Sequence, residues 1–327
     1  MLSWHAENDS KSDSAASPFD AMGLSEALKL IYNLTHYYPD QVPAFTKTLS
    51  HILKILTKTP IPSPPLQSPL INVINCISNL DIRQQDPSHS TTDLLFPSAS
   101  PKSHITKLTT ILDLAIRQYP DEELEKLAVP LINLIGMISE LAPEEVRTYL
   151  QTTFLPSISD RDKPLGATDS LSSCLLRLTS SAVAPMLRES IMDLFFELSN
   201  KDVSSFIRNI GYGYASGYLA AHNLTISRDA LESLGAAVGE RADDPDNGEG
   251  TSVPRAPQRQ NDSESGERRT VRHEVNPITG QRLDRETADT GPPMTEDEKL
   301  REAERLHVLI QRYDTFWTYV DHIADSV

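Results

Sequence analysis

The stretch "LINLIGMISEL", residues 131–141, decides the fold class of this 327-residue chain. Its apolar residues recur with a helical period, and only Asn133, Ser139 and Glu140 are polar. A helix that is apolar on nearly every side must be covered by other elements all round. We therefore expect this helix to lie in the middle of a stack of helices.

Amphipathic helical patterns occur on both sides of this stretch. Apolar residues recur at helical spacing over residues 24–34, 45–58, 69–80, 105–119, 122–141, 168–179, 182–198 and 203–210. Prolines and polar loops separate these segments, and no alternating strand pattern of any length occurs. Paired helices that recur every ~40 to 50 residues are typical of armadillo and HEAT repeats. The sequence predicts an all-α fold, an armadillo/HEAT-like α-solenoid, with a globular helical bundle as the alternative.

Composition divides the chain into four parts. Residues 1–20 are expected to be a disordered tail, and residues 21–238 are expected to form the helical array. Residues 239–293 combine Gly, Pro, Ser and both charge signs and offer little to bury, which predicts a mostly disordered linker. Residues 294–327 return to a helical pattern, so a C-terminal amphipathic helix is expected there.

Two local motifs stand out in the C-terminal third. In "VNPITGQRLDRE", residues 275–286, Pro277 restricts Asn276 to extended conformations and Gly280 permits a positive φ, which predicts a defined turn inside the linker. Further on, Thr295 and Glu298 have the spacing of a capping box. The apolar stripe that follows consists of Leu306, Leu309, Ile310, Tyr313, Phe316, Trp317 and Val320.

Charge and targeting signals narrow the function classes. The formal net charge of -16 argues against sequence-independent binding of nucleic acid, which needs clustered Lys and Arg. The first residues lack the apolar core of a signal peptide, and no run approaches the ~18 apolar residues that span a bilayer. We expect a cytoplasmic protein without membrane insertion, in which Cys76 and Cys174 are buried reduced thiols.

No motif in the sequence carries catalytic chemistry. The glycines of "GYGYASG", residues 211–217, follow an expected helix rather than a strand, and their spacing departs from the dinucleotide fingerprint. Tight helix packing or a turn with positive φ accounts for them. There is no Walker loop, no HExxH and no set of histidines at metal-ligand spacing. We expect no catalytic, cofactor-binding or metal-binding residues, and a binding protein is favoured over an enzyme.

Four stretches resemble the synembryn family, the "resistance to inhibitors of cholinesterase" proteins that act on heterotrimeric G-protein α subunits. These are "VRTYLQTTFLP" with "RDKPLG", then "LFFELSNKDVSSFIRNIGYGYASGYLA", "VNPITGQRL" and "PPMTEDEKLREAERLHVLIQRYD". The stretch from Gly211 is similar to the family's "GYGNAAG" region, and the one from Met294 to its "MTEEQKE" helix start. The resemblance covers most of the chain from about Leu24, and the chain is expected to begin inside the family's repeat array.

The resemblance implies a cytosolic chaperone and guanine-nucleotide exchange factor for Gα, with access to the inner face of the plasma membrane through Gα. Such a protein binds GDP-bound or nucleotide-free Gα, holds the C-terminal helix of Gα in its groove, and presses its own C-terminal segment against the Ras-like domain. It is expected to act as a monomer and to need no active site, because it works by favouring the nucleotide-free state.

The expected partner-binding residues fall into three groups. Arg177, Arg188 and Arg208 lie on array helices and could meet carboxylates of Gα. Asn276, Pro277 and Gly280 form the turn. The third group, from the C-terminal segment, is Met294, Leu306, Leu309, Ile310 and Phe316. Solvated helix faces for the arginines, and docking of the stripe on the chain's own core, remain alternatives. At the level of function, the alternative is a solenoid scaffold that binds a peptide or helix without exchange activity.

Overall fold

The structure, a computed structural model, describes residues 2–7, 18–83, 91–225, 275–276, 278–286 and 301. These residues form helices, and the one pairing of strand type among them is an isolated antiparallel bridge between Val275 and Arg282. The predicted all-α fold is confirmed. The chain divides into two compact units, Met1–Glu286 and Thr287–Val327, and nearly all described residues belong to the first.

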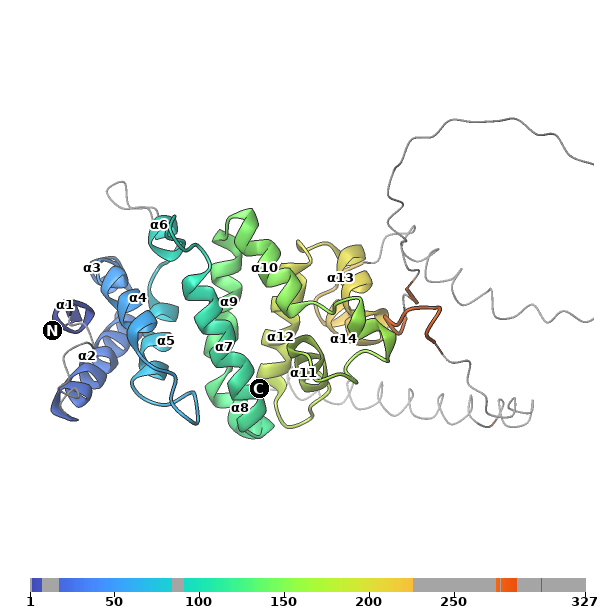
Figure 1. Cartoon of the computed structure of the whole chain (residues 1–327), viewed down its shortest axis with the longest axis horizontal. Coiled ribbons are helices and arrows are strands. Elements are labelled where there is room, and N and C mark those ends of the chain that lie inside the picture. The colour runs from blue at the N-terminus through green and yellow to red at the C-terminus, as the bar shows by residue number, and fades with distance from the viewer. Residues whose placement is uncertain are drawn as a thin grey trace, which may run out of the picture. The chain divides into compact units, whose positions relative to one another are not determined.

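The helices of the first unit follow one another along the chain (Figure 1). They are α1 (Leu2–Glu7), α2 (Pro18–Tyr37), α3 (Val42–Thr46), α4 (Leu49–Lys58), α5 (Leu70–Asn79), α6 (Thr91–Leu95), α7 (Ser103–Gln118), α8 (Asp121–Leu127), α9 (Val129–Leu141), α10 (Glu144–Phe154), α11 (Leu171–Leu178), α12 (Pro185–Leu198), α13 (Val203–Ile210) and α14 (Tyr212–Ala221). Two 3-10 turns, η1 (Pro39–Gln41) and η2 (Ser159–Asp162), complete the set.

The packing of these helices is that of a solenoid. One row, named the inner row below, consists of α2, α5, α9, α12 and α14, each of which packs against the next. A second row covers it: α1 packs on α4 and α4 on α7, while α7, α10, α11 and α13 pack against helices of the first row. Because each helix contacts chiefly its neighbours in the stack, the arrangement is the quasi-one-dimensional packing of helical repeats. The predicted solenoid-type fold is confirmed.

Helix α9 occupies the position that its sequence predicted. It packs against α5, α7, α8, α10 and α12, and Leu131, Leu134 and Ile135 have no exposed surface. Its N-terminal boundary differs from the expected single helix over residues 122–141. The chain breaks into α8 and α9 at Ala128, because Pro130 lacks a backbone N–H and is accommodated best in the first turn of a helix.

The N-terminal region also differs from the expectation. Leu2–Glu7 forms α1, which packs on α4, and the carbonyl of its buried Ala6 accepts a hydrogen bond from Lys58 Nζ at 2.7 Å. Helix α2 begins at Pro18. The structure thus has helix at residues 2–7 and from residue 18, where composition predicted a disordered tail, and the packing of α1 on α4 supplies stability that the local sequence lacks. Residues 8–17 lie outside the described residues.

The predicted linker and C-terminal helix are described in part. Residues 226–274 and all of 287–327 except Arg301 lie outside the described residues. Residues 275–276 and 278–286, named the docked turn below, pack on the end of the array formed by η2, α13 and α14. Part of the segment that composition assigned to a loose linker is thus bound to the folded unit.

Candidate functional site

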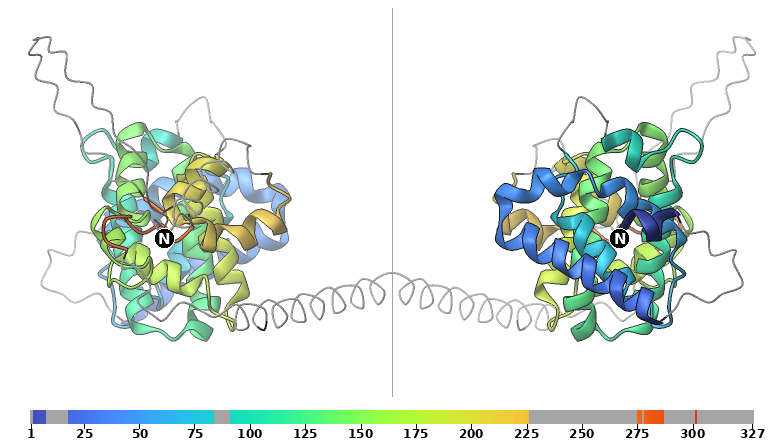
Figure 2. Two further views of the ribbon diagram at one scale, coloured as in Figure 1. Left: turned by 90° about the vertical axis from the view of Figure 1, so that its right-hand side faces the viewer. Right: turned by 90° about the vertical axis from the view of Figure 1, so that its left-hand side faces the viewer.

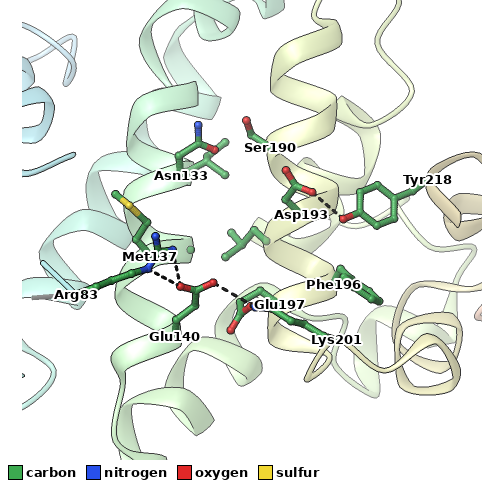
Figure 3. Close-up of a pocket in the computed structure, with 13 residues that line it drawn as sticks. Arg83, Asn133, Met137, Glu140, Ser190, Asp193, Phe196, Glu197, Lys201 and Tyr218 are labelled. Atoms are coloured by element: carbon green, nitrogen blue, oxygen red, sulfur yellow. Dashed lines mark hydrogen bonds and ion pairs between the residues drawn. The ribbon is translucent and has the colours of Figure 1, made fainter. Parts of the chain in front are cut away.

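A pocket of about 340 Å³ opens between α9 and α12, and we name it the α9–α12 pocket. Both helices belong to the inner row of the array, and Arg83 and Lys201, which follow α5 and α12, reach it from the side (Figure 3). Its lining residues are Arg83, Ile132, Asn133, Gly136, Met137, Glu140, Ser190, Asp193, Leu194, Phe196, Glu197, Lys201 and Tyr218. The pocket therefore combines apolar surface with a group of charges at its mouth.

Glu140 is the centre of the charge network in this pocket. Its carboxylate accepts hydrogen bonds from Arg83 Nε at 3.0 Å and from Lys201 Nζ at 3.3 Å, as Figure 3 shows. Burial alone would raise the pKa of Glu140, but the hydrogen bonds from Arg83 and Lys201 outweigh it and hold the pKa below its ordinary value. Lys201 also pairs with Glu197 at 3.0 Å, and this bond contributes most to the raised pKa of the lysine.

The other wall of the pocket carries an acidic group without a cationic partner among the described residues. Asp193 accepts a hydrogen bond from Tyr218 Oη at 2.7 Å, and burial of the phenol, followed by this bond, raises the pKa of Tyr218. One turn away, Glu189 contacts His222 Nε2 at 2.6 Å. With Arg83 and Lys201 already engaged by carboxylates, this side of the pocket favours a partner that brings a positive charge.

Glu189, Asp193 and His222 offer oxygen and nitrogen atoms that all lie within 4.8 Å of one another. Sequence spacing could not reveal this group, because its members come from α12 and from the end of α14. All three side chains are exposed, and each already has a hydrogen-bond partner within the protein. We assign them no metal.

The docked turn is held by its own side chains. Asn276, which is 7% exposed, accepts the backbone N–H of Ile278 at 2.9 Å through its side-chain oxygen. Its side-chain amide donates to both oxygens of Glu286 at 3.0 Å, and its carbonyl accepts the N–H of Gly280 at 2.8 Å. Gly280 has φ +70°, which confirms the positive φ predicted for it.

The docked turn contacts the array at Gly211 and Gly213, where α13 ends and α14 begins. Gly213 N–H donates to the carbonyl of Ile278 at 3.0 Å. Gly211 has φ +79°, and a Cβ there would lie 2.9 Å from the same carbonyl oxygen. A Cβ on Gly280 would clash with Leu165 Cδ1. Two sequence motifs far apart in the chain, "GYGYASG" and "NPITG", are therefore the two sides of one contact.

A buried arginine joins the docked turn to the array. Arg161 is 8% exposed, and its guanidinium donates to the carbonyls of Gly280 and Asn209 at 2.7 Å and of Arg208 at 3.2 Å. Burial lowers the pKa of Arg161, and neighbouring Asp160 opposes this effect. In addition, the Arg282 N–H donates to the Arg161 carbonyl at 2.9 Å.

Asp160 in turn holds the loop that carries Arg161. Its carboxylate accepts the Thr168 hydroxyl at 2.6 Å and both the N–H and hydroxyl of Ser157, at 2.9 and 2.7 Å. Burial would raise the pKa of Asp160, but these hydrogen bonds lower it to about 2. Neither Asp160 nor Arg161 was singled out from sequence, because charged pairs in a turn segment are usually solvated. The stretch "RDKPLG" was the one signal that could have found Arg161.

The three predicted arginines do not converge on one pocket. Arg177 donates to the carbonyls of Gly166 and Thr168, both at 2.7 Å, and lines a second cavity of about 480 Å³ beside α7 and α11. Arg188 on α12 and Arg208 on α13 are exposed and line neither of the two cavities. Arg177 therefore holds a loop of its own protein, whereas the other two remain available to a partner.

The other predicted partner-binding residues divide in the same way. Asn276 and Gly280 are buried in the docked turn, so their side of the turn faces the protein itself. Six of them lie outside the described residues: Pro277, Met294, Leu306, Leu309, Ile310 and Phe316.

The predictions for Cys76 and Cys174 are confirmed: both are buried and both are free thiols. Burial raises the pKa of Cys76 to about 12. Among the described helices, none is both long and apolar enough to cross a membrane.

The fold is that of a helical-repeat protein, and its described residues include a pocket between α9 and α12. A sequence model of the Ric8 family, guanine nucleotide exchange factor synembryn, matches residues 1–315. The chain belongs to this family, which confirms the resemblance seen in the sequence.

Relatives of the chain include proteins named chaperone Ric-8A. The chicken protein, from Gallus gallus, is 24% identical over 242 residues, which are 72% of this chain and 39% of the relative. The Xenopus laevis protein is 27% identical over 184 residues, 56% of this chain and 29% of its own length. The Mus musculus protein is 26% identical over 191 residues, which are 58% of this chain and 31% of the relative. The chain thus spans 39% or less of these relatives.

Proposed function

We propose that this protein binds the α subunit of a heterotrimeric G protein, assists its folding and promotes release of its nucleotide. The observation that carries the proposal is the family match over residues 1–315, together with relatives that are named chaperones. A solenoid that presents a pocket on its inner row of helices supports it, because grooves of stacked helices bind segments of other proteins.

Exchange by this mechanism requires no catalytic side chain. The protein engages GDP-bound Gα but binds nucleotide-free Gα more tightly than either nucleotide-bound form, and this difference in affinity shifts the equilibrium towards loss of nucleotide. Entry of GTP then releases Gα from the complex. This chain therefore needs only to bind one conformation of Gα more tightly than the others.

The α9–α12 pocket is the proposed binding site for the C-terminal helix of Gα. Its apolar residues, such as Met137 and Phe196, suit the apolar face of a helix, and Asp193 suits a Lys or Arg on that helix. Arg188 on α12 and Arg208 on α13 are exposed, and they are proposed to meet carboxylates of Gα. The residues from Met294 to Phe316 are proposed to contact the Ras-like domain, with the protein in the cytoplasm and at the inner face of the plasma membrane through Gα.

The test is the rate of GDP release from purified Gα, measured with a fluorescent or radiolabelled nucleotide and the full chain as catalyst. We expect a concentration-dependent acceleration and co-elution of nucleotide-free Gα with the chain. Asp193→Arg should weaken Gα binding at least about tenfold, as the loss of a desolvated charge pair costs on the order of 1–3 kcal/mol. The matched control is Asp169→Arg, an exposed site outside this pocket.

The alternative is a solenoid scaffold that binds a peptide or helix without exchange activity. Such a scaffold would bind Gα, or the isolated C-terminal peptide of Gα, and leave the GDP release rate unchanged. Charge reversal at Arg188 and Arg208 tests the proposed surface separately, since unchanged affinity at low salt would remove these residues from it.

A further inference from the structure

The docked turn provides the N-terminal cap of α14. The N-cap residue of this helix is Gly211, which has no side chain that could accept a backbone N–H. Instead, the Gly213 N–H donates to the carbonyl of Ile278 in the docked turn at 3.0 Å. The first N–H groups of a helix lack partners within it, so this carbonyl takes the place of a Ser or Asp side chain. The start of α14 therefore depends on a segment that is distant in the sequence.

Further contacts tie the same end of α14 to the docked turn. The Tyr214 hydroxyl, in the first turn of α14, donates to the Leu165 carbonyl at 3.0 Å, and the Leu165 side chain lies against Gly280. Arg161 donates both to Gly280 and to the carbonyl of Asn209 in the last turn of α13. Figure 2, left, looks onto this end of the array, where the docked turn, in orange, lies beside α13 and α14.

The sequence of α14 makes the helix dependent on these contacts. Its ten residues, YGYASGYLAA, include Gly213 and Gly217, and glycine disfavours a helix more than every other residue except proline. A helix of this length is marginal without support from its surroundings. An N-cap contributes a factor of about 2 to 30 to a helix equilibrium. The docked turn should therefore decide how far α14 frays.

The C-terminal half of α14 holds the acidic wall of the α9–α12 pocket. Tyr218, which is 9% exposed, donates from Oη to Asp193 at 2.7 Å, as Figure 3 shows. His222, the C-cap residue of the helix, lies with Nε2 2.6 Å from Glu189. These contacts restrict the orientation of two carboxylates that are otherwise exposed on α12. A carboxylate that is already held in one orientation loses less entropy when a cationic group binds to it.

We propose that docking of residues 275–286 positions the acidic wall of the α9–α12 pocket, with α14 as the link and Tyr218 as the positioning residue. When the turn is docked, α14 is capped and the wall is held ready for a cationic group of the ligand. When the turn leaves, α14 frays and Asp193 and Glu189 lose their orientation. The pocket then binds its ligand less tightly, although none of the described residues of the docked turn lines it. The identity of the ligand rests on the proposed binding of Gα, whereas the coupling does not.

Tyrosine labelled with ¹³C at Cζ reports on this coupling in the full chain without any ligand. The NMR signal of Cζ responds to the hydrogen bond of the phenol, and Tyr218→Phe identifies the signal that belongs to Tyr218. We expect Gly280→Ala, which clashes with Leu165, and Arg161→Met, which removes the guanidinium, to shift this signal towards that of exposed tyrosines. Ile52→Val, a buried change on α4, is the control for a general loss of stability. An unchanged signal in both turn variants, or an equal shift in the control, overturns the inference.

A rescue experiment tests the role of α14 as the link. Gly217 is helical with nothing within 4 Å of an added Cβ, so Gly217→Ala should favour the helix about fivefold without a new contact. Combined with Arg161→Met, it should restore most of the native Tyr218 signal although the turn stays released. Circular dichroism checks that each variant is folded. A released turn without any rescue by Gly217→Ala overturns this role of α14.

The binding readout is the affinity of the full chain for the isolated C-terminal peptide of Gα, measured by isothermal titration calorimetry. Arg161→Met and Tyr218→Phe should each weaken binding about three- to tenfold. The double variant should bind about as weakly as the weaker single variant, because both changes act on one step. Effects that multiply in the double variant overturn the coupling. A native chain that does not bind the peptide contradicts the proposed function, and the NMR comparison then decides the inference by itself.

Discussion

At the scale of single residues, two glycines and one buried pair fix the contact between the docked turn and the array. Gly211 and Gly280 both have positive φ. A Cβ on Gly211 would clash with the carbonyl of Ile278 in the docked turn, and a Cβ on Gly280 would clash with Leu165 of the array. Asp160 and Arg161 are buried charges whose hydrogen bonds go largely to hydroxyl and backbone groups. Buried charges persist in a fold only where such partners satisfy them.

Gly280→Ala should loosen the docked turn. Positive φ is strained for alanine, and the new Cβ would clash with Leu165 Cδ1, so we expect a loss of about 1–3 kcal/mol in docking. Limited proteolysis should then cleave near residues 275–286 several-fold faster. Gly217→Ala is the control: it is helical with nothing within 4 Å of its Cβ, and alanine should leave stability equal or slightly higher. Equal cleavage of both variants would contradict the prediction.

Asp160→Asn should make stability less dependent on acid pH. The folded pKa of about 2 lies below the ordinary value, so ionised Asp160 contributes stability that is present above about pH 4 and disappears as the pH falls towards 2. At pH 7 the variant should be less stable by about 1–2 kcal/mol, and the difference should shrink between pH 4 and 2. Urea unfolding at several pH values measures it, with exposed Asp169→Asn as control; a difference that stays constant with pH would refute the assignment.

At the scale of elements, the docked turn behaves as a small element of its own. It forms no helix, and its order comes from the Asn276 side chain, the Arg161 guanidinium and the backbone of the α13–α14 junction. Composition alone assigned this segment to a loose linker, whereas its turn motif predicted a defined turn. The motif was the better guide, because a few specific hydrogen bonds outweigh the low apolar content of twelve residues.

Arg161→Met should release the docked turn without unfolding the array. Three carbonyls lose their donor, those of Gly280, Asn209 and Arg208. Hydrogen exchange should accelerate by at least about tenfold at the amides of Gly213, Gly280 and Arg282, since each lost bond to a charged group is worth about 1.5–3 kcal/mol. Amides in α9, far from this contact, serve as the internal reference. Unchanged protection of Gly213 would show that Arg161 does not hold the turn.

At the scale of the whole molecule, the chain consists of one compact unit, Met1–Glu286, and a second unit, Thr287–Val327. The first has its own core along both rows of helices and carries the α9–α12 pocket and the docked turn. The second contains the apolar stripe that the sequence predicts for the C-terminal helix. Separate units allow stability and function to be separated by experiment.

Truncation after Glu286 should therefore weaken nucleotide exchange more than it lowers the melting temperature. Because the described core belongs to the first unit, we expect the midpoint to change by less than about 2 °C. The GDP release rate of Gα should fall at least about tenfold. Thermal unfolding and the exchange assay on the same protein check both parts, and a collapse of the fold without a separate functional loss would contradict the division.

The sequence by itself determined the helical class, the central position of α9 and the positive φ of Gly280, because local periodicity, apolar content and turn chemistry act over a few residues. The resemblance of its motifs to the synembryn family indicated the family to which the chain belongs. Only the tertiary structure decided that α1 is ordered, that the α9–α12 pocket has an acidic wall, and that Arg177 serves its own loop while Arg161 joins two distant motifs. Several of these features depend on groups that meet across 52 or 119 residues of the chain, such as Lys58 with Ala6 and Arg161 with Gly280, and no local pattern encodes those meetings.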